Sequence, residues 1–151
     1  MALFSKRNVV SVIIILFVFI SCFTGVKINS QKRTFNKIQE DCNYTYVQCL
    51  EQIAYRIEDY KNSKDSVTMR NAASWAGKAT IASKNMNYER KQDLSYIATM
   101  LDEFFANSIR PESAIKTGSI YRLIPYLKAV AKYPNDKQKI DDLTQILPSI
   151  D

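Results

Sequence analysis

Histidine is absent from this sequence, and glycine and proline are scarce. Without histidine, the chain lacks both the side chain whose free pKa lies closest to neutrality and the commonest zinc ligand. It holds only 3 glycines and 4 prolines in 151 residues, too few for the many turns of a sheet-rich domain. The composition therefore favours an all-α fold and weakens the case for histidine-based catalysis or zinc binding.

Sequence motifs that carry chemistry are also missing. The chain contains no dinucleotide fingerprint, P-loop, HExxH or EF-hand loop. Two acid pairs near aromatic residues, Glu58–Asp59 and Asp102–Glu103, are the candidates for catalysis by carboxylates. Neighbouring residues of a helix point about 100° apart, so neither pair converges on a substrate. We therefore expect a protein that is not an enzyme and holds no cofactor and no metal.

The most prominent feature that is present is a charge-free apolar run at residues 9–26. As a helix this run is about 27 Å long, close to the hydrocarbon core of a bilayer at about 30 Å. Lys6 and Arg7 precede it, and basic flanks tend to stay in the cytoplasm. The pattern predicts a cytoplasmic segment at residues 1–8, a membrane anchor at residues 9–26 and an extracytoplasmic chain beyond it, at the cell membrane or envelope.

Three fates are open for this apolar segment. An uncleaved signal anchor fits best. The stretch from Phe19 to Cys22 resembles the lipobox of bacterial lipoproteins, which would make Cys22 a lipid attachment site. Phe19 and Phe23 depart from the usual lipobox residues, and they also fit poorly with ordinary signal-peptide cleavage, the third fate.

The net charge of +6 is spread along the chain and forms no basic tract. A mixed, solvated surface is the plain explanation of this pattern. We expect membrane lipid and another protein as partners, and no nucleic acid.

Beyond the anchor, apolar residues recur at helical spacing. Residues 27–34 form a linker or the start of the first helix. The periodicity then predicts helices near 35–61, 65–85, 89–108, 115–131 and 136–147. The residues predicted to face the core include an apolar stripe on the first helix, small residues on the second and apolar residues on the last: Ile38, Cys42, Tyr46, Cys49, Ile53 and Ile57; Ala72, Ala76 and Ala79; Ile140 and Leu143. Gly77, inside the second helix, is expected to permit a close backbone crossing. Short polar connections favour an antiparallel bundle of four to five helices over residues 35–148. We expect a break at residues 110–113, and either a kink at Pro125 or a short helix opened by Gly118.

Two cysteines and one tryptophan fall on the predicted apolar faces. Cys42 and Cys49 lie two turns apart, too far to bond within one regular helix. We expect them in the core, with bonding to a partner as the alternative. Trp75 is expected to anchor the core or an interface.

Aromatic and basic residues cluster late in the chain, at Tyr121, Arg122, Tyr126 and Tyr133. Tyrosine and arginine are enriched at protein interfaces, so these residues are the candidate interaction surface. The sequence favours a non-catalytic interaction or accessory module of a membrane or cell-envelope protein. The alternatives are a bundle that senses or carries a small ligand, and a lipoprotein anchored through Cys22.

Overall fold

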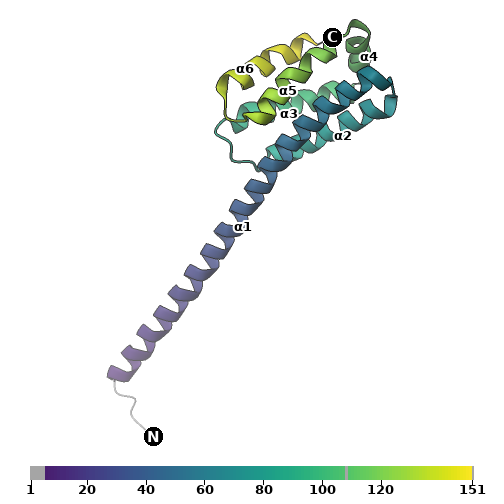
Figure 1. Cartoon of the computed structure of the whole chain (residues 1–151). Coiled ribbons are helices and arrows are strands. Elements are labelled where there is room, and N and C mark those ends of the chain that lie inside the picture. Colours follow the sequence, from purple (N-terminus) through teal and green to yellow (C-terminus); the bar gives the residue numbers. More distant parts are fainter. Residues whose placement is uncertain (1–5, 108, 151) are drawn as a thin grey trace. The chain divides into compact units, whose positions relative to one another are not determined.

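The regular elements of this protein are all helices over the part of the chain that the structure describes, which confirms the all-α prediction. The computed structural model describes residues 6–107 and 109–150, with side chains from residue 16 on except at 22, 109 and 110. The elements are α1 (Lys6–Ser63), α2 (Ser66–Ser83), α3 (Lys91–Ala106), α4 (Ile109–Thr117), η1 (Ser119–Arg122), α5 (Leu123–Lys132), α6 (Lys137–Ile146) and η2 (Leu147–Ser149) (Figure 1).

The chain divides into two units, residues 1–38 and residues 39–151. In the first unit the described residues belong to α1, and residues 27–34 are helical like their neighbours. Large apolar side chains are exposed along this part of α1, with Phe17, Phe19 and Phe23 each more than 70% exposed.

Among the residues whose side chains are described, no helix combines the length and the apolar character needed to cross a membrane. The predicted anchor at residues 9–26 includes residues 9–15 and Cys22, whose side chains lie outside the described part. Lipid attachment at Cys22 falls there too, and both stay predictions.

In the second unit, the remainder of α1 carries the predicted apolar stripe into the core. Tyr46, Cys49, Ile53 and Ile57 follow one another at steps of three or four residues and are all fully buried. Residues three and four apart share one face of a helix, so the local pattern was enough to identify this face. Ile38, at the start of the predicted stripe, is 46% exposed.

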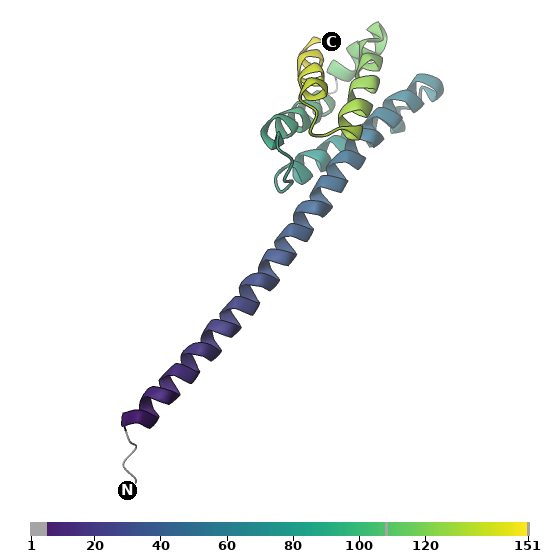
Figure 2. The same ribbon diagram turned by 60° about the vertical axis from the view of Figure 1, so that its left-hand side comes forward.

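Helices α2 and α3 pack side by side through small residues (Figure 1, Figure 2). Ala72, Ala76 and Ala79 of α2 are fully buried, and small side chains let helix axes approach closely. The Thr80 hydroxyl donates to the Ala98 carbonyl at 3.1 Å, and the hydroxyls of Ser83 and Ser95 are 3.1 Å apart. The predicted inner face of α2 is therefore the face that meets α3.

Helix α4 occupies the segment where a break was predicted, and that prediction was wrong. Pro111 is the third residue of α4, within the first turn. The first backbone N–H groups of a helix have no intrahelical acceptor, so a proline there costs no hydrogen bond. The residue pair at 110–111 therefore lies inside the start of a new helix.

The connection to α5 follows the second of the two alternatives for Gly118 and Pro125. Gly118 adopts a left-handed conformation with φ 76° and precedes the short helix η1. Helix α5 begins at Leu123, so Pro125 again falls within a first turn. Leu123, Leu127, Val130 and Ala131 of α5 are buried in the core, which turns the other face of α5 outward.

Candidate functional site

Two of the predicted interface residues meet in one cleft between α5 and α6. Arg122 and Tyr126 are four residues apart, so they lie on one side of the chain where η1 leads into α5. They line an open cleft of about 330 Å³ together with Asp142, Gln145, Ile146 and Ser149. We call these six residues the α5–α6 cleft. Arg122 is exposed and Tyr126 is half-buried, so the tyrosine ring forms part of the wall.

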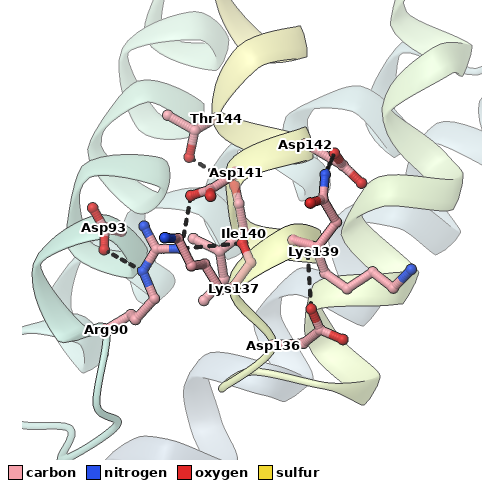
Figure 3. A network of polar contacts seen from close by, with 10 residues as sticks. Arg90, Asp93, Asp136, Lys137, Lys139, Ile140, Asp141, Asp142 and Thr144 are labelled. Carbon is pink, nitrogen blue, oxygen red and sulfur yellow. Dashed lines mark hydrogen bonds and ion pairs between the residues drawn. The ribbon is translucent and has the colours of Figure 1, made fainter.

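The far wall of the α5–α6 cleft comes from α6, and a polar network fixes where α6 begins. Arg90, just before α3, donates from Nε to Asp93 and from Nη1 to Asp141, both at 2.7 Å (Figure 3). Its Nη1 also donates to the Lys137 carbonyl at 3.0 Å. The hydrogen bond to Asp141 is the main cause that raises the pKa of Arg90. One guanidinium thus ties the first turn of α6 to the start of α3.

The N-cap of α6 completes this arrangement. The Asp136 carboxylate accepts the backbone N–H of Lys139 at 3.2 Å, in the capping position. One turn further on, Gln138 donates to the Asp142 carboxylate at 2.7 Å. Asp142 therefore has a partner of its own, whereas Arg122 makes no ion pair with any residue that the structure describes. Among the described residues Arg122 is the cation of the α5–α6 cleft that a ligand can pair with, while the neutral Gln138 amide leaves the Asp142 carboxylate on the opposite wall without a counter-charge.

Tyr121 belongs to a different cluster, at the end of α1. The Lys61 ammonium lies 5.7 Å from the Tyr121 ring centroid, and the Lys64 ammonium lies 5.8 Å from the same centroid and 5.7 Å from that of Tyr60. Lys64 also donates to the Tyr121 hydroxyl at 3.4 Å. These contacts are cation–π interactions, so the Tyr121 ring is engaged within the protein and does not line the α5–α6 cleft.

The two remaining candidates lie elsewhere in the second unit. Trp75 of α2 is half-buried against the core, and the Lys78 ammonium sits 4.1 Å from its ring centroid. Tyr133 follows the last residue of α5, is 50% exposed and has Lys132 over its ring at 5.2 Å. Neither residue lines the α5–α6 cleft.

Sequence reasoning missed the residues that α6 and η2 contribute to the α5–α6 cleft. Asp142, Gln145 and Ser149 are polar residues between apolar ones, as on any solvated helix face, and carry no motif. The register of Asp142 and Gln145 on α6 relative to the predicted core residues Ile140 and Leu143 places these two on the outer side, which was the one available signal.

Buried ionisable groups lie beneath the surface, on α1. The Tyr46 hydroxyl donates to the Leu94 carbonyl at 2.7 Å, and burial raises the pKa of Tyr46 well above its usual range. Burial also raises the pKa of the Cys49 thiol to about 11, against a smaller opposite effect of Lys78. A protonated buried thiol is a poor nucleophile. Cys42 and Cys49 form no disulfide.

The acid pairs do not form a shared site. Glu58 pairs with Lys128 at 2.7 Å, with both side chains about half exposed. Asp102 lies beside Gly77 of α2, where its Oδ1 is 3.5 Å from the position a Cβ would take. In the described part of the chain, no three acidic or cysteine side chains gather closely enough to hold a metal ion.

No protein-family description matches this chain, and neither the curated proteins nor the solved structures contain a significant match.

Proposed function

We propose that this protein is a non-catalytic accessory module, held at a membrane by residues 9–26, that binds another membrane or envelope protein through the α5–α6 cleft. The observation that carries the proposal is the convergence of Arg122 and Tyr126 in one cleft. Arginine and tyrosine are the residue types that most often dominate binding energy at interfaces.

The membrane part of the proposal is supported by the apolar run itself. Its residues are uncharged from Val9 to Val26, and insertion of such a run into lipid is favourable. From Leu16 to Ile20 every side chain is more than half exposed. A helix that is apolar on all sides calls for an apolar surrounding, which lipid supplies. Lys6 and Arg7 favour an extracytoplasmic second unit.

The chemistry of the α5–α6 cleft selects a particular kind of partner. The exposed guanidinium of Arg122 makes no ion pair with the described residues and calls for a carboxylate, since Arg forms bidentate bonds with carboxylates. The Tyr126 ring offers an amphipathic surface beside it, and Gln145 and Ser149 offer hydrogen bonds. We infer that the bound element is an extracytoplasmic loop of a membrane protein, with an acidic side chain placed at Arg122.

Site-specific photo-crosslinking in intact membranes tests this function. A benzoylphenylalanine residue at position 126 should give a discrete crosslinked adduct. The same residue at position 55, where Tyr55 is 53% exposed on α1, is the matched control and should not. The change Arg122→Glu should abolish the adduct at position 126. Equal adducts at both positions, or an adduct that survives Arg122→Glu, would sink the proposal.

The form of the anchor is a separate question with its own measurement. An uncleaved anchor, a lipid on Cys22 and a cleaved signal peptide give three different intact masses for the purified protein. We propose the uncleaved anchor because Phe19 and Phe23 fit neither kind of processing site well.

A further inference from the structure

A second cleft, distinct from the α5–α6 cleft, opens where α2, α3 and α4 meet the end of α1. Its volume is about 300 Å³, at the lower end of the range for small-molecule sites. We call it the α2–α4 cleft; its lining includes Tyr60, Met69, Arg70, Phe105, Glu112 and Ile115. Most of its surface is apolar, so a ligand needs an apolar part of limited size.

Among its described lining residues, the α2–α4 cleft also carries one charge of each sign. Arg70 comes from α2 and Glu112 from the first turn of α4. Both side chains line the cleft and are exposed, and neither pairs with the other or with another described residue. Opposite charges that share a cleft without pairing are available to a ligand that carries both.

Lys64, close to Tyr60 of this cleft, already makes contacts within the protein. The Lys64 ammonium rests against the rings of Tyr60 and Tyr121, and its backbone is left-handed, with φ 56°. Left-handed backbone is unfavourable for a residue with a Cβ, and here the side chain is tied down by the two rings. Among the described residues that line the α2–α4 cleft, Arg70 is therefore the cation that faces a ligand.

We propose that the α2–α4 cleft binds a free amino acid with an apolar side chain. The ligand carboxylate pairs with the fork of Arg70, and its ammonium pairs with Glu112. Its side chain packs against Met69, Phe105 and Ile115. A ligand with a single charge would gain only one of these two charge-assisted contacts. The small volume excludes a phospholipid with its two acyl chains.

Calorimetric titration of the full-length protein in detergent tests the ligand class. Leucine or phenylalanine should bind saturably. N-acetyl-leucine lacks the ammonium, leucinamide lacks the carboxylate and glycine lacks the apolar side chain. Each should bind at least about tenfold more weakly, as the loss of a charge-assisted contact or of apolar burial implies. Equal binding of leucine and N-acetyl-leucine, or no binding of leucine at millimolar concentration, would overturn the proposal.

Variants locate the binding. Arg70→Gln and Glu112→Gln change exposed side chains and leave the core intact, and each should weaken leucine binding about tenfold or more. Arg122→Gln, in the α5–α6 cleft, and Glu89→Gln, at another exposed acid, are the matched controls and should bind like the unchanged protein. Undiminished binding by Arg70→Gln would place the ligand elsewhere. Photo-crosslinking at position 126 should be unaffected by Arg70→Gln, so the proposals for the two clefts are tested independently of each other.

Discussion

The hydroxyl of Tyr46 donates a 2.7 Å hydrogen bond to the backbone carbonyl of Leu94, and both residues are fully buried. This bond joins α1 to the first turn of α3 inside the core. A buried tyrosine needs such a partner, because its hydroxyl has left water. The pair therefore sets the rotation of α1 about its own axis relative to the α2–α3 pair.

Removal of this hydroxyl should be measurable. We expect Tyr46→Phe to lower the free energy of unfolding by about 1 kcal/mol, the usual net value of an intramolecular hydrogen bond. Urea titration followed by circular dichroism measures it. Tyr55→Phe is the control, since Tyr55 is half exposed, and it should change stability by less than about 0.5 kcal/mol. Equal losses in the two variants would show that the hydrogen bond of Tyr46 adds nothing to the free energy of unfolding beyond the effect of a half-exposed tyrosine hydroxyl.

Stability should fall at alkaline pH because two buried acids resist ionisation. Burial raises the pKa of Cys49 to about 11 and that of Tyr46 further above its usual value. In the unfolded chain the cysteine thiol has the pKa of a free thiol, about 8.5. Above that pH the native state holds more protons than the unfolded state, so stability declines with rising pH. The contribution is complete below about pH 8.5 and is lost as the pH rises through about 11.

Urea midpoints at several pH values measure this decline. Cys49→Ala removes one titrating group, so its stability should fall less steeply between about pH 8.5 and about pH 11, whatever its stability at neutral pH. Parallel curves of stability against pH for the variant and the unchanged protein would mean that the Cys49 thiol does not contribute to the alkaline loss of stability.

Arg90 should stabilise the first two turns of α6 against local unfolding. In Arg90→Met, the bonds to Asp141 and to the Lys137 carbonyl are lost together. We expect faster hydrogen exchange at the backbone amides of the first two turns of α6, measured by mass spectrometry of peptides. Lys128→Met removes an exposed pair with Glu58, and should leave exchange in α6 unchanged. Unaltered exchange in Arg90→Met would show that packing alone holds α6.

Two glycines should respond in opposite directions to the same substitution. A Cβ at Gly77 would meet only Asp102 Oδ1, at an ordinary contact distance of 3.5 Å. Gly77→Ala should therefore raise the free energy of unfolding by about 0.5–1 kcal/mol through helix propensity. At Gly118, φ is 76°, and Gly118→Ala should lower it by roughly 1–2 kcal/mol. Thermal unfolding distinguishes the two: a gain in stability at both positions would contradict the prediction for Gly118, and a loss at both would contradict the prediction for Gly77.

The fold could be predicted where its signals are local, and less well where packing decides. The stripe from Tyr46 to Ile57 and the small face of α2 follow from spacing alone, and both are buried as expected. Helix α4 was missed because a proline marks a helix boundary without telling which side of it the helix occupies. Gly77 had been expected to permit a close backbone crossing, yet its nearest neighbour is the flexible end of a side chain.

The candidate site divides in the same way. Arg122 and Tyr126 could be named from residue type and from their spacing of four. Asp142 and Gln145 reach the same cleft through the packing of α6 against α5 and α3, to which the contact of Arg90 with Asp141 adds, and these contacts join residues far apart in the sequence. Tyr121 could not be separated from Arg122 by sequence, because its neighbours Lys61 and Lys64 lie at the end of α1.

We propose that residues 9–26 hold the helical second unit at the outer face of a membrane, and extraction combined with protease accessibility separates this arrangement from its alternatives. The full-length protein should stay in the membrane pellet at alkaline carbonate wash and dissolve only in detergent. Protease added to the outside of intact, wall-stripped cells should digest residues beyond 38. Recovery of the intact chain in the soluble fraction without detergent, or full protection of the second unit until the membrane is broken, would contradict the account.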